Sequence, residues 1–214
     1  MNIDFSDAVN AKESGARLTP GIKDATFDGI EFNEGTSQKS GEPYQAFVLK
    51  LNIDGYGPYQ QKFFEPKSAD RQEMQWGVSA SPLDHFKITV MEILEAICPD
   101  VYAEFNAGTK KLSGSFKQIV DAIATYTKPH IGKQTKVKIL PGKDNFCNMP
   151  SFPARIDRNG NLGIATRMIG DNLTLTSSEL KKIEAAEAAR PTDMSQKTII
   201  SSMAADVNSD DLPF

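Results

Sequence analysis

Residues 44–53 read Tyr-Gln-Ala-Phe-Val-Leu-Lys-Leu-Asn-Ile, and their alternation is the clearest structural signal in the chain. Large apolar side chains stand at every second position from Phe47 to Ile53. Because successive side chains of a strand point to opposite faces, this period puts Phe47, Leu49, Leu51 and Ile53 on one face. The stretch therefore predicts a half-buried β-strand.

Strand patterns continue on both sides of this stretch. Residues 21–32 alternate less regularly, and Gly29 predicts a bulge in a long bent strand. Residues 33–43 are rich in Gly, Pro and short polar residues, which predicts a turn. Asp54-Gly55 begins a second, shorter turn, and residues 59–64 then predict a third strand. Three consecutive antiparallel strands are typical of the start of a small closed barrel.

The next 67 residues, about 66–132, change to helical spacing. Ser81-Pro82 predicts the start of a helix that ends at Cys98-Pro99. Residues 101–105 form a further short segment, and a second amphipathic helix is expected over 115–127. This part of the chain is expected to be a helical insertion.

Alternation returns at residues 133–140, where Val137 and Ile139 are expected to point inward and Lys136 and Lys138 outward. Residues 146–156 combine aromatic residues and prolines, and a last turn over 159–161 leads into residues 162–169. Strand–strand–strand, helix, strand–strand is the element order of an oligonucleotide/oligosaccharide-binding (OB) barrel. We therefore expect a mainly β fold over residues 1–170: a five-stranded antiparallel barrel with a helical insertion between its third and fourth strands.

The chain changes character again after residue 170. Thr176-Ser177-Ser178-Glu179 is a capping-box sequence, so residues 171–190 are expected to contain a short helix that acts as a stalk. Residues 191–214 show no sustained period and few large side chains, which predicts a disordered acidic tail.

Charge is distributed unevenly along the 214 residues. The net charge is −4, yet residues 109–158 carry ten basic and three acidic side chains. A protein that is acidic overall can still bind a polyanion if its cations converge in one groove. Neither a leader nor a long apolar run is visible, which favours a cytoplasmic protein without a membrane partner.

Metal and catalytic motifs are missing from the sequence. Cys98, Cys147, His85 and His130 are too far apart to form a close ligand pair, so neither zinc nor another cofactor is expected. Phosphate-binding loops, Gly-x-Ser-x-Gly and His-Glu-x-x-His are likewise missing. These observations favour equilibrium binding over an enzymatic reaction.

Single-strand binding without sequence preference needs aromatic faces for bases and cations along the backbone. Both residue types gather in the second and third strands, at the start of the insertion, and in residues 133–158. The candidate DNA-binding residues are Tyr44, Tyr59, Lys62, Phe63, Lys67, Arg71, Trp76, Lys133, Lys136, Lys138, Lys143, Phe152, Arg155 and Arg158.

The last residues printed are Asp210-Asp211-Leu212-Pro213-Phe214, with Asp206 a little before them. Acidic and apolar side chains together suit an apolar pocket rimmed by Lys or Arg on another protein. This segment resembles the acidic tip of bacterial and phage single-stranded DNA-binding proteins, and the length and insertion favour a phage protein. The resemblance implies a protein that coats single strands in replication, recombination and repair and recruits partners through Asp206, Asp210, Asp211, Leu212, Pro213 and Phe214.

Two alternatives remain open from the sequence. The same barrel could be a module that binds RNA or a protein, since small barrels share this element order. An enzyme that processes nucleic acid is the second alternative.

Overall fold

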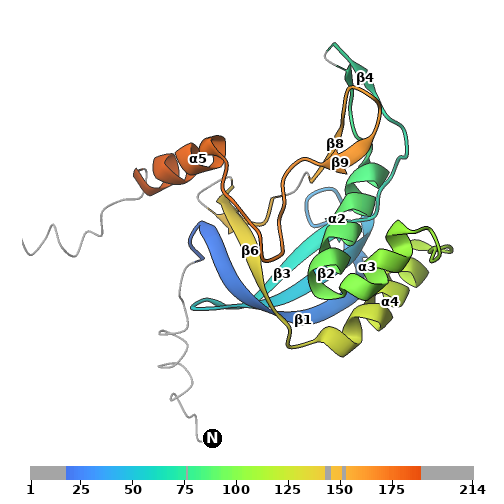
Figure 1. Cartoon of the computed structure of the whole chain (residues 1–214), viewed down its shortest axis with the longest axis horizontal. Helices are drawn as coiled ribbons and strands as arrows, with labels where there is room; N and C mark the ends of the chain where they lie inside the picture. The colour runs from blue at the N-terminus through green and yellow to red at the C-terminus, as the bar shows by residue number, and fades with distance from the viewer. Residues whose placement is uncertain (1–17, 76, 143–145, 151–152, 189–214) are drawn as a thin grey trace, which may run out of the picture.

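A strongly curled antiparallel sheet of five strands forms the centre of the molecule (Figure 1). The structure is a computed structural model, and it describes residues 18–75, 77–142, 146–150 and 153–188. The strand order is β3-β2-β1-β6-β7. The strands are β1 (Gly21–Thr36), β2 (Pro43–Ile53), β3 (Gly57–Phe64), β6 (Gln134–Pro141) and β7 (Cys147–Asn148).

The predicted strands of the first half are confirmed. Phe47, Leu49, Leu51 and Ile53 are buried, as their alternation predicts. The bulge in β1 also exists: the register with β2 shifts between Phe27 and Gly29. Gly29 has φ +124°, a conformation that residues with a Cβ rarely adopt, so glycine allows the strand to bend here. The bend lets β1 pair with β2 along most of its length and with β6 near its start.

Three helices lie against the sheet on the side seen at the right of Figure 1. Both longer helices begin with a capping box, built by Ser81 and Asp84 in one and by Ser115 and Gln118 in the other. The helices are α2 (Pro82–Ile97), α3 (Pro99–Asn106) and α4 (Phe116–Thr127), followed by a short 3₁₀ turn, η1 (Lys128–His130).

Aromatic rings join these helices to the sheet. Phe86 of α2 lies 6.1 Å from Phe47 of β2 and 5.3 Å from Phe116 of α4, measured between ring centroids. Phe116 in turn lies 6.4 Å from Phe32 of β1. Such tilted ring contacts each add roughly 0.5–1.5 kcal/mol to the area that they bury. The helices are thus part of the same core as the strands.

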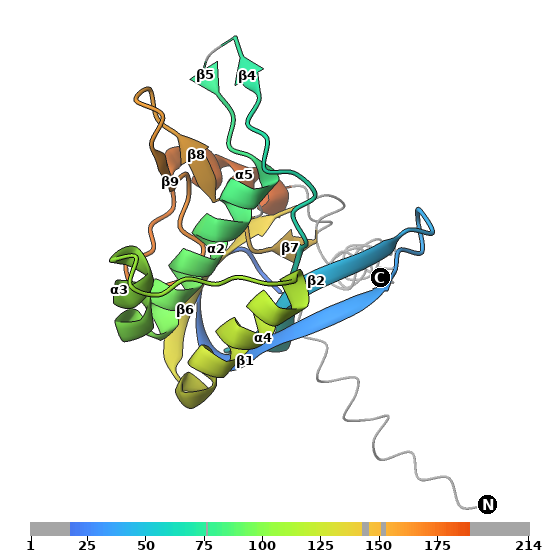
Figure 2. The ribbon, with the colours of Figure 1, turned by 90° about the vertical axis from the view of Figure 1, so that its right-hand side faces the viewer.

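Two small hairpins and one further helix complete the described chain. The first hairpin extends away from the body in Figure 2, and the second packs near the start of α2. Residues 168–170 pair with β6, since the amide of Lys138 donates to Met168 and the amide of Gly170 to Lys136. The elements are β4 (Glu73–Met74), β5 (Gly77–Val78), β8 (Ala154–Ile156), β9 (Leu162–Ile164) and α5 (Ser177–Ala188).

The sheet forms a half-barrel. A five-stranded barrel was expected, but after β6 the chain forms the two-residue β7 and then β8, which pairs with β9 and not with the sheet. Within the described residues the sheet's two outer strands, β3 and β7, share no ladder. The amide of Met149, just after β7, donates instead to the Tyr59 hydroxyl of β3 at 3.1 Å. Within the described ranges, every helix is too short or too polar to cross a membrane.

Candidate nucleic-acid interface

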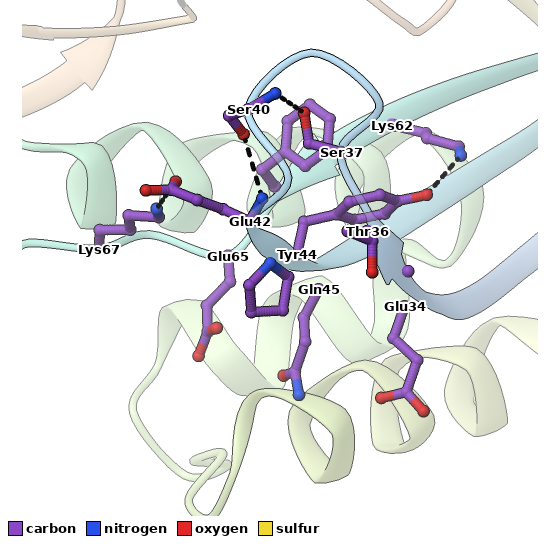
Figure 3. Close-up of a pocket in the computed structure, with 13 residues that line it drawn as sticks. Glu34, Thr36, Ser37, Ser40, Glu42, Tyr44, Gln45, Lys62, Glu65 and Lys67 are labelled. Atoms are coloured by element: carbon purple, nitrogen blue, oxygen red, sulfur yellow. Dashed lines mark hydrogen bonds and ion pairs between the residues drawn. The ribbon is translucent and has the colours of Figure 1, made fainter.

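A depression of about 760 Å³ lies where the β1–β2 loop meets the end of β3 (Figure 3). Its wall combines aromatic, basic and acidic side chains on three adjacent strands and their loops. The main residues that line it are Glu34, Gly35, Glu42, Tyr44, Gln45, Lys62, Phe64, Glu65 and Lys67.

Two aromatic rings and one lysine form the outer part of this depression. The ring of Tyr44 meets that of Phe64 edge-on at 5.5 Å between centroids, and Phe64 is 60% exposed. The Lys62 Nζ atom lies 5.4 Å from the centre of the Tyr44 ring. Binding sites for single-stranded nucleic acids combine an exposed ring, on which a base stacks, with a cation for the phosphate. We call Tyr44, Phe64 and Lys62 the ring–lysine site.

Strand register explains why these three side chains meet. Ala46 of β2 is opposite Phe64, and Val48 is opposite Lys62. Since alternate residues share a face, Tyr44 on β2 lies on the same face as Phe64 and Lys62.

Polar neighbours hold the ring–lysine site in place. The Tyr44 hydroxyl donates to Asn33 Oδ1 at 3.2 Å, and the Lys62 ammonium donates to the same oxygen at 3.3 Å. A Cβ at Gly35 would lie 3.0 Å from the Tyr44 hydroxyl oxygen, so the absence of a side chain there lets the ring lie against β1. In the described part of the chain Lys62 has no carboxylate partner, and its charge is therefore available to a phosphate.

Carboxylates of the depression lie mainly on the other face of the strands. Glu34 is opposite Gln45 in the register, and the amide of Glu65 donates to the Gln45 carbonyl. In Figure 3 the side chains of Glu34, Gln45 and Glu65 point away from Tyr44 and Lys62. Glu42 differs, because it pairs with Lys67 at 3.5 Å, and both side chains are exposed. The ring–lysine site therefore contains one cation that is unpaired among the described residues, and the carboxylates of Glu34 and Glu65 lie on the other face of the strands.

Tyr59, predicted as a stacking residue, lies in the core. It is 8% exposed, and its hydroxyl donates to Gln61 Oε1 at 2.6 Å while accepting from Met149. Burial raises the pKa of its hydroxyl, although the bond from Met149 opposes that shift. Its ring cannot reach a base, because it helps to bring β3 and β7 together.

Phe63 and Phe64 divide between the two faces of β3, as the geometry of adjacent strand residues requires. Phe63, the candidate named from the sequence, packs on the core side against Phe47 at 5.8 Å. Phe64 is the exposed one. Phe64, which was not among the candidate DNA-binding residues, therefore occupies the exposed position that was expected for Phe63.

The prediction that Lys138 points outward is wrong. Lys138 is 2% exposed, and its ammonium donates to both carboxylate oxygens of Glu179 at 3.1 Å and to Thr166 at 3.2 Å. A buried, neutralised ammonium is not available to a phosphate.

Two further predicted cations have structural roles. The Arg71 guanidinium makes two hydrogen bonds to Asp84, at 2.8 and 3.1 Å, and so holds the pKa of that carboxyl well below its usual range. Lys133 donates to the carbonyl of Ile97 at 3.0 Å. Arg71 thus supports the start of α2, and Lys133 supports its end.

The remaining predicted cations do not form one groove with the rings. Lys136 lies exposed on β6, Arg155 on β8, and Arg158 in the β8–β9 turn. In Figure 2 the β8–β9 hairpin and the β1–β2 loop lie on opposite sides of the molecule. Among the predicted cations that the structure describes, Lys62 and Lys67 are the two that line the depression.

Several predicted residues lie outside the described residues. They are Trp76, Lys143 and Phe152 among the DNA-binding candidates, and Asp206, Asp210, Asp211, Leu212, Pro213 and Phe214 in the tail.

Sequence reasoning missed Asn33 and Gly35 as well as Phe64. Asn33 was treated as a turn residue, although it stands within β1 opposite Ala46. Pairing residues 33–36 with 43–46, once the hairpin was assumed, would have indicated all three positions. A scan against protein-family models found no match to this sequence, and a search of curated proteins found none either.

Proposed function

We propose that this protein binds single-stranded DNA without strong sequence preference, through the ring–lysine site on the outer face of β2 and β3. The observation that carries the proposal is the pair of contacting rings, one of them 60% exposed, next to a lysine with no carboxylate partner among the described residues. Every base has a π-face, so such a ring accepts any base, and the lysine offers a contact to the adjacent phosphate.

The place of the site in the fold supports the same proposal. OB barrels bind oligonucleotides on the face of their second and third strands, next to the loop between the first two. Here the ring–lysine site lies on β2 and β3 beside the β1–β2 loop. We extend the proposal accordingly to an OB-type barrel, with α2, α3 and α4 as its insertion.

Coating single strands in replication, recombination and repair is the role that follows, with partners recruited through residues 206–214. The proposed mechanism is equilibrium binding, in which no covalent bond is made or broken. Two bases stacked on this site would contribute about 2–6 kcal/mol, at about 1–3 kcal/mol for each base.

Replacing the rings tests the proposal directly. Phe64→Ala and Tyr44→Ala should each weaken binding of a fluorescently labelled oligo-dT strand by about 5- to 150-fold, measured by anisotropy. Tyr56→Ala is the matched control, because Tyr56 is also an exposed aromatic residue but lies at the opposite end of the β2–β3 hairpin. If Phe64→Ala and Tyr56→Ala bound oligo-dT with equal affinity, the ring–lysine site would not be the DNA-binding site.

Competition experiments separate the alternatives. Unlabelled RNA that displaced oligo-dT as well as DNA does would point to a general single-strand binder. Cleavage or modification of labelled strands in the presence of magnesium would instead indicate an enzyme.

A further inference from the structure

A second, apolar hollow opens between the helices, away from the strands that carry the ring–lysine site. It has a volume of about 240 Å³ and lies between α2 and α4, next to α3 and the loop that follows it. Phe86, Met91, Phe105, Leu112 and Ile119 are only partly buried where they line it. We call this hollow the helix groove.

One lysine lines the helix groove, and a second is the chain neighbour of a lining residue. Lys87 of α2 lines it, and Lys111 directly precedes the lining residue Leu112. Both are exposed, and neither makes a hydrogen bond or an ion pair with another described residue. The neighbouring Lys110 and Lys117 are different, since they are paired with Glu104 and Asp121. An apolar groove with two unpaired ammonium groups suits a ligand that combines apolar side chains with carboxylates.

One segment of this chain has that chemistry. In Asp210-Asp211-Leu212-Pro213-Phe214, two adjacent carboxylates precede Leu212 and Phe214. The groove has room for one or two apolar side chains, and Lys87 and Lys111 are opposite in charge to Asp210 and Asp211.

The chain is long enough for this contact. Residues 189–209 separate α5 from Asp210, and 21 extended residues span up to about 70 Å. A compact domain of the described size is roughly 40 Å across. The segment can therefore reach the helices, although α5 lies on the other side of the molecule from α2 and α4 in Figure 1.

Charge favours the helix groove over the depression beside the ring–lysine site. That depression is lined by three carboxylates, those of Glu34, Glu42 and Glu65, and one of its two lysines is already paired. Carboxylates of the tail would be repelled there, whereas no acidic residue lines the helix groove.

We infer that the helix groove binds residues 210–214 of the same chain, with Leu212 and Phe214 in the groove and Asp210 and Asp211 beside Lys87 and Lys111. The bound segment withholds its acidic and apolar side chains from partner proteins until a partner displaces it. This contact does not involve the ring–lysine site and does not depend on nucleic-acid binding.

A labelled peptide of residues 206–214 tests the inference on the chain that lacks those residues. We expect a dissociation constant on the order of 100 μM by anisotropy, and at least tenfold weaker binding for the double variant Lys87→Glu/Lys111→Glu. Lys181→Glu/Lys182→Glu is the matched control, because both of these lysines are exposed on α5. A Phe214→Ala peptide should lose binding. Undiminished binding to Lys87→Glu/Lys111→Glu would overturn the inference.

A second experiment measures binding of the same peptide to the full chain. Tethering gives a local concentration on the order of 1 mM, so the full chain should bind the added peptide about tenfold more weakly than the shortened chain does. Equal affinities would show that the groove is not occupied by the chain's own segment. Because no nucleic acid is present, failure here leaves the proposed DNA binding untouched.

Discussion

Glu92 is a carboxylate in the core, on the face of α2 that packs under residues 168–169. It is 1% exposed; its Oε1 accepts hydrogen bonds from the amides of Met168 and Ile169, and its Oε2 has no partner among the described residues. Burial raises its pKa to about 7, although the two amides and nearby Arg167 oppose that shift. Arg167 is itself paired with Glu95 at 3.0 Å.

The raised pKa makes stability depend on pH. The folded state holds its proton more tightly than the unfolded state, whose carboxyl has a pKa near 4.5. The stabilisation is therefore complete below pH 4.5 and is lost as the pH rises towards 7, by on the order of 3 kcal/mol.

Replacing Glu92 by Gln should remove this dependence. The amide keeps an oxygen for Met168 and Ile169 but carries no charge, so Glu92→Gln should raise the melting temperature at pH 8 and change it little at pH 5. Glu187→Gln, which removes an exposed carboxylate on α5, serves as the control. A variant less stable than the wild type at pH 8 would show that the charged form is tolerated in the core.

The first turn of α5 is attached to β6 through a buried ion pair. Thr176 and Glu179 form the predicted capping box, with the amide of Thr176 donating to Glu179 at 2.7 Å. The same carboxylate accepts from Lys138 and Thr166. Burial raises the pKa of Glu179, but these hydrogen bonds outweigh it, so the pKa lies below its ordinary value. This stabilisation is present above the ordinary pKa and is lost as the pH falls through the folded value.

Glu179→Ala should detach α5 and destabilise the whole chain. It leaves the Lys138 ammonium buried without its partner, which costs about 3–5 kcal/mol. Urea unfolding should show this loss, and hydrogen exchange should show reduced protection of α5.

The exposed Glu184 of the same helix provides the control, since Glu184→Ala removes a carboxylate without touching the pair. The double variant Lys138→Met/Glu179→Leu should recover most of the stability, because it removes both charges together. If Glu179→Ala behaved like Glu184→Ala, the ion pair would have no role in anchoring α5.

Over the whole molecule, acidic and basic side chains are mixed around the proposed DNA site. Glu34 and Glu65 line the same depression as Lys62 and Phe64, and exposed charges interact over a Debye length of about 10 Å at 0.1 M salt. They should therefore repel the phosphates at low ionic strength.

Glu34→Gln/Glu65→Gln should accordingly tighten binding to oligo-dT several-fold at 50 mM salt, with the gain shrinking at 0.5 M salt. The double variant Glu184→Gln/Glu187→Gln on α5 makes the same change in net charge away from the site. Titrations at the two salt concentrations measure both. Equal gains from the two pairs would mean that only net charge matters and would contradict the assigned site.

Local patterns in the sequence predicted most of the elements, whereas the site depended on contacts between distant residues. Alternation identified β2, Ser81-Pro82 identified the start of α2, and a capping box identified α5, because each of these signals lies within a few residues of sequence. Lys138 was misplaced because its partner Glu179 is 41 residues away in the sequence. Tyr59 was misplaced because its hydroxyl meets Met149, 90 residues further along the chain.

The contact between Tyr59 and Met149 also bridges the two outer strands of the half-barrel. Among the described residues β3 and β7 share no ladder. The amide of Met149, just after β7, donates one hydrogen bond to the Tyr59 hydroxyl of β3. One hydrogen bond is lost more easily than a ladder, in which several bonds would have to break at once. Tyr59 and Phe64 belong to the same strand, so we expect a change at this edge to alter the curvature of the sheet beneath the ring–lysine site. Such a change would let the proposed DNA site follow strands whose bases are unevenly spaced.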